Sequence, residues 1–449
     1  MASPADDRLR RILGDGALPR GAPPPERSLP PGRAPDPARE ARMAALQARL
    51  ATLNVTAPRG PAQALGPTPP PSRPEDRRPL EQQVGGRVEA AAQGGYIRVE
   101  RRFPLESLHG RVVLAEALAH TLRLPTRDRG PDGPRTLRAA DAVLLDTETT
   151  GLAGGTGTVA FLVGTGHVED DALVVRQYAL RDYPDEAALL HALHHDLGER
   201  PLVTFNGRAF DWPLLRTRFL LHRLKVRERP HLDLLPLARR IWNTLPSRAL
   251  GMLERHVIGL ERRDDLPGSE VPAAWFRWLR CGEGGVLARA FQHNETDVVS
   301  MLALMACIGS VLEGSSSGML SSPHDHLSTA RLLLDHGDEA RARRCVDAGL
   351  ALAEGADAGP LLHLKAHVAR RAGDHDGALR AWQAAIAVAH EQDVRAHVEA
   401  AKLLEHRLAR PAEALALTEA ALARTARDPV AHEALERRAA RLRRRLGLG

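Results

Sequence analysis

The sequence predicts an α/β fold, in which helices flank a mixed sheet, followed by an all-α region of helical repeats. Two patterns in the 449-residue chain carry this prediction. Between residues 143 and 221, short apolar runs typical of strands alternate with longer helical segments, in the order strand, strand, strand, helix, strand, helix. Beyond residue 325, small residues recur at a fixed spacing in a sequence rich in helix-forming residues.

Composition shifts divide the chain into five expected segments. These are a disordered arm rich in Pro, Ala and Arg (1–85), a lead-in subdomain (86–140), the mixed-sheet domain (141–310), a Ser- and Gly-rich linker (311–324) and the helical repeats (325–449). The arm carries repeated proline runs and cannot bury enough apolar surface to offset its chain entropy. One stretch within it, Arg39–Leu53, has helical periodicity and is either a transient helix or a partner-binding segment.

Within the lead-in subdomain, we expect a strand at residues 96–103 and a helix from Val112 to Leu122. In the central domain, the pair Gly154–Gly155 lies between two predicted strands. Because the Lys of a phosphate-binding loop is missing there, we interpret the pair as a tight hairpin.

Composition and charge bound the possible partners and location. Hydrophobic residues make up 43% of the chain, and its formal net charge of +6 is compatible with a polyanionic partner without demonstrating one. The three cysteines show neither paired nor metal-ligand spacing, which indicates reduced thiols and a cytoplasmic location. The N-terminus lacks the apolar core of a signal peptide, and no run of about 18 apolar residues predicts a membrane span.

The stretch VLLDTETTG at residues 143–151 carries the first candidate site. An apolar strand leads into Asp146, and Glu148 follows two positions later, so both carboxylates are expected on one face of the strand. Two carboxylates held together repel each other unless a cation lies between them, and Mg²⁺ prefers such oxygen ligands. The alternative is a strand that ends in an acidic, Thr-rich turn.

Two further aspartates follow predicted strands. In FNGRAFDWPLL, Asn206 and Phe210 precede Asp211, which lies at the start of a predicted helix. On its own, Asp211 fits a helix N-cap as well as a third site carboxylate, and the N-cap is the simpler interpretation. Asp233, in HLDLLPL, is also a possible ligand, but we favour a helix-opening role for it.

A predicted helix near residue 300 carries the last candidates. His293 and Asp297 are four residues apart and therefore share one helical face. Such a pair is either a structural hydrogen bond or a general base beside a metal ligand. The acidic segment Glu261–Pro272 is either a lid or substrate loop, or an ordinary solvated loop.

Taken together, DxE at 146–148, NxxxFD at 206–211 and HxxxD at 293–297 resemble, in order and separation, the three exonuclease motifs of the DEDD superfamily. The strand and helix order is also that of the RNase H-like fold. The surrounding sequence resembles the YprB-like family of predicted exonucleases over residues 95–310, through the stretches DTETTGLAGGTGT, VTFNGRAFDWPLL, LPSRALGMLERHVIG, DDLPGSEVP and HNETDVVSML.

The resemblance implies roles for individual residues. Two Mg²⁺ or Mn²⁺ ions would be bound by the four carboxylates Asp146, Glu148, Asp211 and Asp297. His293 would be the general base, while Asn206 and Phe210 would position the substrate. In His-type members of the superfamily the base lies five residues before the last Asp, whereas His293 lies four before it. This departure bears on the assignment of His293 as the base more than on the assignment of the metal ligands.

The helical tail repeats with a period of 36 residues. Ala342, Ala378 and Ala414 mark the period, and seven residues after them come Gly349, Ala385 and Ala421. The pattern resembles tetratricopeptide repeats, whose usual period is 34, and an unrelated Ala-rich bundle is the alternative. Such repeats usually hold a protein partner. The arginine cluster near the C-terminus either contacts phosphates or is a solvated helix.

The resemblance implies a hydrolase: a metal-dependent 3′–5′ exonuclease that acts on DNA or RNA. The alternative is a non-catalytic adaptor, in which the central domain binds nucleic acid and the repeats recruit a protein. The carboxylates favour the enzyme, because a scaffold has no need of clustered negative charge.

Overall fold

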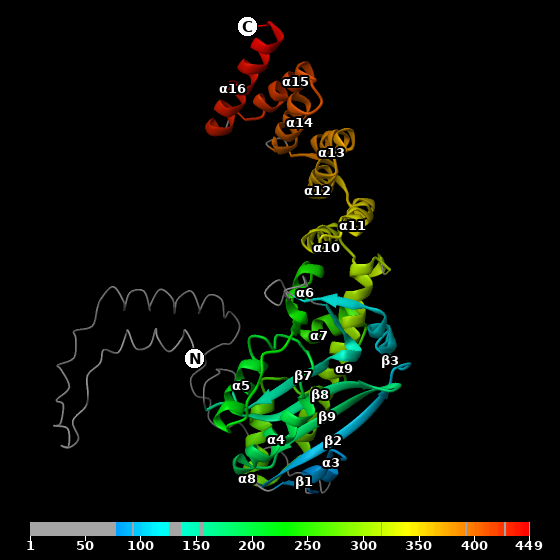
Figure 1. Cartoon of the computed structure of the whole chain (residues 1–449), viewed down its shortest axis with the longest axis vertical. Coiled ribbons are helices and arrows are strands. Elements are labelled where there is room, and N and C mark those ends of the chain that lie inside the picture. The colour runs from blue at the N-terminus through cyan, green and yellow to red at the C-terminus, as the bar shows by residue number, and fades with distance from the viewer. Residues whose placement is uncertain are drawn as a thin grey trace, which may run out of the picture. The chain divides into compact units, whose positions relative to one another are not determined.

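Figure 1 shows the computed structural model of the chain. It describes residues 78–91, 94–124, 136–151, 157–315, 317–390, 393–425 and 428–448. The greater part of the predicted arm, with the helix expected at Arg39–Leu53, lies outside these residues, and so does the hairpin expected at Gly154–Gly155.

Seven strands form one mixed sheet, as the sequence predicts. Their order across the sheet is β1-β2-β9-β8-β7-β10-β11. The strands are β1 (Arg87–Ala91), β2 (Gly94–Pro104), β7 (Val143–Thr149), β8 (Ala160–Glu169), β9 (Ala172–Leu180), β10 (Leu202–Thr204) and β11 (His231–Asp233). Neighbours from β1 to β7 are antiparallel, whereas β10 runs parallel to both β7 and β11.

The lead-in segment adds strands to this sheet. β2 pairs with β9 from Tyr96 to Pro104, so the expected strand at 96–103 is confirmed. The helix expected at Val112–Leu122 is wrong. The segment instead forms β4 (Val112–Val113), a 3₁₀ helix (Leu114–Ala119) and β5 (Thr121–Arg123). β4 pairs with β3 (Leu108–His109), and β5 pairs with β6 (Thr136–Arg138). Its buried residues Leu114 and Ala117 are three apart, which matches the period of a 3₁₀ helix.

Helices cover both faces of the sheet. Residues of β7 alternate between two hydrophobic cores, because successive strand side chains point to opposite faces. Val143 and Leu145 pack with α4 (Glu186–Leu197), α5 (Asp211–Leu221) and α8 (Val271–Cys281), and Leu144 packs with the 3₁₀ helix, α6 (Leu234–Ile241) and α7 (Leu250–Leu253). A short α3 (Leu80–Gln83) and a π-helical turn (Glu254–Ile258) complete this part.

The long helix α9 (Gly285–Glu313) joins the two cores. Its first half contributes Leu287 and Phe291 to the core of α4, α5 and α8, and its second half, from Val298 to Leu312, fills the other core. By length and hydropathy alone α9 could cross a membrane, which corrects the expectation that no such segment exists. The neighbouring elements explain its apolar character, because 83% of its most apolar window is buried inside the protein.

The C-terminal region is a series of three helix pairs, α10–α11, α12–α13 and α14–α15, followed by α16. They are α10 (Pro323–Asp335), α11 (Glu339–Leu352), α12 (Ala358–Arg371), α13 (His375–Val388), α14 (Arg395–His406), α15 (Pro411–Leu422) and α16 (Pro429–Leu446). Ala342, Ala378 and Ala414 are each the fourth residue of the second helix in a pair, and each is fully buried. The predicted period therefore marks equivalent packing positions.

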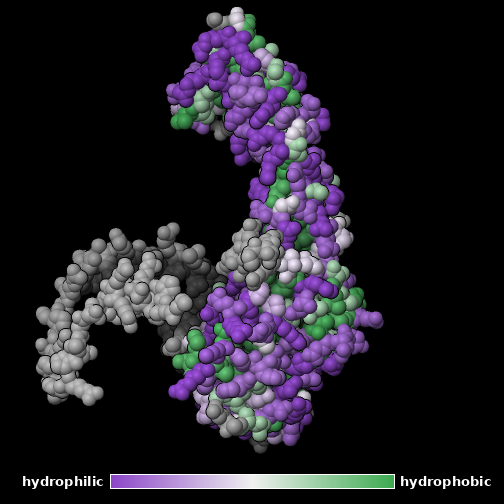
Figure 2. Space-filling view, in the orientation of Figure 1, coloured by the Kyte–Doolittle hydropathy of each residue, from purple (hydrophilic) through white to green (hydrophobic). Residues whose placement is uncertain are grey.

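The described surface is largely hydrophilic (Figure 2), with hydrophobic residues gathered in a few patches. Large apolar side chains exposed there include Leu108 of β3 and Leu220 and Leu221 of α5. All three cysteines are free thiols, as their spacing predicts.

Candidate functional site

The end of β7 directs Asp146 toward α9 and Thr147 toward α5. Asp146 and Glu148 share the strand face that carries Leu144, whereas Thr147 lies on the opposite face. The Asp146 side chain meets α9, where Asn294 Nδ2 donates a hydrogen bond of 2.8 Å to Asp146 Oδ2. Thr147 Oγ1 donates to Asp211 Oδ1 at 2.5 Å. The strand therefore links the acidic residues of α9 and α5.

Asn294 is a site residue that the sequence reasoning missed. It is fully buried, and its Oδ1 accepts a hydrogen bond of 2.8 Å from Gln177 Nε2 on β9. Gly164 of β8 leaves the space for it, because a Cβ there would lie 2.4 Å from Asn294 Oδ1. An Asn within an apolar helix is a signal of a buried polar contact, since a buried amide needs partners. Asn294 thus fixes the orientation of Asp146.

Asp211 is buried at the first position of α5. The N-cap of that helix is Phe210, and no side chain caps it. The N-cap interpretation of Asp211 is therefore wrong, because the Asp211 carboxylate is directed to Thr147. Gly207 makes room for this carboxylate, since a Cβ at residue 207 would lie 2.8 Å from Asp211 Oδ2.

The connection before α5 is held by Asp233. Its carboxylate accepts hydrogen bonds from the backbone N–H groups of Asn206 at 2.8 Å and Arg208 at 3.2 Å. It also accepts from Leu235 N at 3.1 Å and caps α6, which confirms the predicted helix-opening role. Asn206 has a φ of 66°, a left-handed conformation that Asn tolerates. Asn206 and Phe210 are both exposed beside Asp211.

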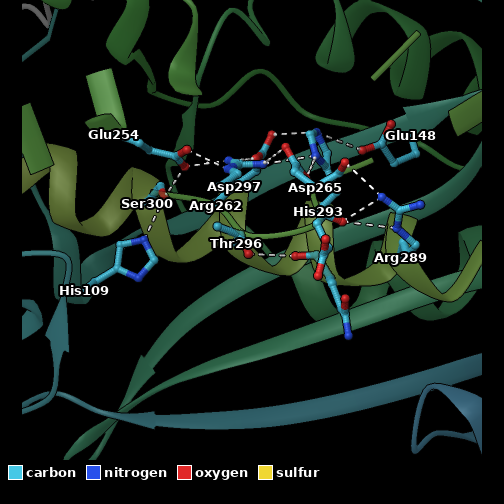
Figure 3. A network of polar contacts seen from close by, with 12 residues as sticks. His109, Glu148, Glu254, Arg262, Asp265, Arg289, His293, Thr296, Asp297 and Ser300 are labelled. Atoms are coloured by element: carbon cyan, nitrogen blue, oxygen red, sulfur yellow. Dashed lines mark hydrogen bonds and ion pairs between the residues drawn. The ribbon is translucent and has the colours of Figure 1, made fainter. Parts of the chain in front are cut away.

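The ring of His293 has acidic residues on two sides (Figure 3): Glu148 and Asp297 lie near its Nε2, and Asp265 lies near its Nδ1. Its Nε2 is 3.8 Å from Asp297 Oδ2 and 4.0 Å from Glu148 Oε1. Its Nδ1 is 2.7 Å from Asp265 Oδ1. Asp265 belongs to the acidic segment for which a loop role was expected, and the structure brings it into contact with the site.

Arg262 is a second residue of that segment in the site (Figure 3). Its guanidinium donates two hydrogen bonds, of 2.5 and 2.6 Å, to the buried carboxylate of Glu254, and a third to Asp297 Oδ1. Glu254 also accepts from Ser300 Oγ at 2.5 Å, and Ser300 in turn contacts His109 Nε2 at 2.7 Å. This network holds Arg262 in place. Sequence reasoning missed it, because its members lie far apart along the chain.

The pKa values of the four predicted ligands are all raised. Burial, and next the charges of Asp297, Glu148 and Asp211, hold the pKa of Asp146 well above its ordinary value. Burial with the charges of Asp297 and Asp211 raises the pKa of Glu148 to about 8. Burial raises the pKa of Asp211 to about 6, although the hydrogen bond from Thr147 acts to lower it. Burial also raises the pKa of Asp297, although the charge of Arg262 acts to lower it. The partners that the cluster has within the protein therefore do not offset the cost of burying its charged forms.

The chemistry of the donors fits a hard divalent cation. Their oxygens are the ligands that Mg²⁺ and Mn²⁺ prefer. Burial is the main cause of the raised pKa values, and repulsion from the neighbouring carboxylates, which a cation would relieve, adds to it at Asp146 and Glu148. Among the residues that the structure describes, no group of three or more His, Cys, Asp or Glu side chains already has the geometry of a metal site. The contact of Asp297 with Arg262 shows that one of these carboxylates has another partner.

Two comparisons show which known proteins this chain is similar to. The profile of the RNase H superfamily matches residues 143–308, which span β7 to α9. The chain is also 34% identical over 220 residues to the uncharacterized protein YprB of Bacillus subtilis (strain 168). That region is 46% of this chain and 51% of YprB, so the chain spans about half the length of the curated relative it matches. Residues 143–308 are thus similar to domains of the RNase H superfamily, a likeness that suggests nuclease chemistry on nucleic acids.

Proposed function

We propose that the chain is a metal-dependent exonuclease that hydrolyses phosphodiester bonds of DNA or RNA from the 3′ end. The observation that carries the proposal is the cluster of four carboxylates at the end of β7, whose pKa values are all raised. A cluster of this kind costs stability in the absence of a cation, so its presence favours a site that binds one.

Asp146, Glu148, Asp211 and Asp297 would hold two Mg²⁺ or Mn²⁺ ions. When bound, such a pair of ions activates a water molecule and stabilises the leaving oxygen of a phosphodiester. Asn294 keeps Asp146 turned toward α9. Thr147, on the other face of the strand, orients Asp211 through its hydrogen bond to that carboxylate.

His293 would act as the general base. Its Nε2 faces Glu148 and Asp297, where it can accept the proton of the attacking water. The water oxygen bonds to phosphorus, the bond from phosphorus to the 3′ oxygen breaks, and a nucleoside 5′-monophosphate leaves. Phe210 is 38% exposed beside Asp211, and an exposed aromatic ring can stack on a base of the substrate strand, while Asn206 would contact the strand next to it.

A metal-dependent digestion panel tests the proposal. Single- and double-stranded DNA and RNA, labelled at either end, are incubated with Mg²⁺, Mn²⁺ or EDTA and with wild type or Asp146→Ala. We expect a 5′ label to move down a ladder of shortened strands and a 3′ label to be released at once as a mononucleotide. Asp171→Ala is the matched control, because the Asp171 side chain is 96% exposed in the hairpin between β8 and β9.

Intact substrates with both metals would contradict the nuclease. If the protein instead retained nucleic acid without cutting it, equally well in EDTA and in Asp146→Ala, an adaptor would be favoured. In that case the helices α10–α16 would be the surface to examine for a protein partner.

A further inference from the structure

The contact between Asp265 and His293 resembles the way in which a base is oriented in other hydrolytic sites. The two side chains are 2.7 Å apart, from Asp265 Oδ1 to His293 Nδ1, on the side of the ring that faces away from the metal-ligand carboxylates. A base whose second nitrogen is held by a third group has a fixed ring orientation and a fixed tautomer.

Two contacts compete for His293 Nδ1. Asp265 can accept a hydrogen bond only if Nδ1 carries the proton, whereas Arg262 Nη1, at 3.0 Å, can donate only if Nδ1 has a free lone pair. A neutral imidazole carries one N–H, so the two contacts exclude each other. Both contacts involve a charged group, and the carboxylate contact is the shorter one, which favours it over the contact with Arg262.

The other nitrogen does not oppose this assignment. The distances from Nε2 to Glu148 and Asp297 are 4.0 and 3.8 Å, which are too long for hydrogen bonds. A proton on Nε2 would therefore gain no bonded partner there, and the Nδ1–H tautomer is favoured. Arg262 is already bound to Glu254, and its Nη1 lies 3.4 Å from Asp265 Oδ2, where it supports the carboxylate.

The protein also fixes the backbone that carries Asp265. Arg289 lies one turn before His293 on α9, and its Nη2 donates to the carbonyl oxygens of Asp264 at 2.8 Å and Asp265 at 3.0 Å. The next residue, Leu266, is buried in the core with 1% of its surface exposed. The segment is thus tied to the helix that bears the base.

We propose that Asp265 is a positioning residue, which holds the proton of His293 on Nδ1 and leaves the lone pair of Nε2 directed at the carboxylate cluster. This inference rests on the proposed function, in which His293 is the general base.

The test compares Asp265→Asn with Asp264→Asn. Both variants remove one negative charge from the same loop. The side chain of Asp264 is exposed, and its φ of 52° suits Asn, so Asp264→Asn is the matched control. In Asp265→Asn the new amide can donate to Nδ1, which moves the ring proton to Nε2. We expect kcat to fall about 10- to 100-fold with KM within roughly 2-fold of wild type, and no such fall in the control.

A spectroscopic arm reads the tautomer without activity. Two-bond ¹H–¹⁵N correlations of metal-free protein labelled at histidine are recorded, and the His293 signals are identified by their loss in His293→Gln. We expect the Nδ1–H pattern in wild type and Asp264→Asn, and the Nε2–H pattern in Asp265→Asn.

An unchanged tautomer and kcat in Asp265→Asn would overturn the inference, and so would an equal loss in Asp264→Asn. If wild type cleaved no substrate, the proposed function would fall. The tautomer measurement would still decide whether Asp265 sets the state of the ring, so the two failures are distinguishable.

Discussion

The two faces of the sheet carry two acidic groups that differ in how their charge is balanced. On the face opposite to Asp146, the carboxylate of Asp196 on α4 accepts hydrogen bonds from Thr165 Oγ1 at 2.7 Å and from His167 Nε2 at 2.9 Å, and Arg176 lies 3.5 Å away. Burial acts to raise the pKa of Asp196, but these partners hold it below its ordinary value. The protein itself thus supplies the hydrogen-bond donors and the positive charge that stabilise ionised Asp196.

The carboxylates at the end of β7 show the opposite balance. Their pKa values are raised, although Arg262 and His293 act to lower that of Asp297. Burial is common to both groups, so burial alone does not distinguish a functional site from a structural one. The difference lies in how far the internal partners offset burial, and under the proposed function a divalent cation would supply the rest.

The largest expected effect is on catalysis. Asp146→Asn removes the charge of a proposed metal ligand but keeps an acceptor for Asn294, so the fold should survive while kcat falls about 1,000-fold or more. Initial rates on the preferred labelled substrate, with circular dichroism to confirm folding, measure this. A rate close to that of wild type would place the chemistry elsewhere.

The second effect is on stability and belongs to the other face. Asp196→Asn keeps one oxygen acceptor but removes the negative charge opposite Arg176 and His167, which is 1% exposed, so the free energy of unfolding should fall by about 3 kcal/mol. Urea denaturation measures it. Glu169→Gln is the control. Because Glu169, another partner of Arg176, is partly exposed, its substitution should lower the free energy of unfolding by about 1 kcal/mol or less. Activity per folded molecule should stay unchanged in both variants.

The third effect links pH to metal binding. The pKa values of Asp211 and Glu148 are raised in the folded protein, to about 6 and about 8, so the folded chain keeps protons that the unfolded chain has released. This contribution to stability is complete below pH 4 and is lost as pH rises through about 6 and then about 8.

Metal-free protein should therefore lose roughly 5 kcal/mol between pH 5 and pH 8.5. Because Mg²⁺ binds the ionised form, its stabilising effect should grow over the same range. Thermal melts with Mg²⁺ or EDTA at each pH measure both trends. A Mg²⁺ effect that did not change with pH would argue against ionisation of these carboxylates on binding.

The smallest effect concerns the residue that orients Asp146. Asn294→Ala removes its hydrogen bond, and we expect kcat to fall about 10-fold and the apparent affinity for Mg²⁺ to weaken. Gln177→Ala is the matched control, because Gln177 bonds to Asn294 and to Phe291 O but not to Asp146. It should lower stability while most of the activity remains.

Local patterns predicted much of the fold. The order of strands and helices from residue 143 to 221 gave a mixed sheet, and the 36-residue period marked the buried alanines of α11, α13 and α15. Alternation along β7 placed Asp146 and Glu148 on one face. The segment 112–122 was misjudged, because apolar residues three apart suit a 3₁₀ helix as well as an α-helix.

The remaining site residues could not be predicted, because their contacts depend on distant segments. Asp265 contacts a histidine 28 residues later, and Thr147 a carboxylate 64 residues later. Asn294 lies 148 residues after its acceptor Asp146, and only the packing of α9 on a glycine of β8 joins them. No local period or spacing encodes such pairs.

His293, Asn294 and Asp297 are carried on a single helix whose other half is embedded in the core. The three residues lie within about one and a half turns of that helix, so they have little freedom to adjust independently of one another. A small change of tilt, as from a larger residue in place of Gly164, would displace all three together. The geometry of the site is therefore set by the spacing between one helix and one strand.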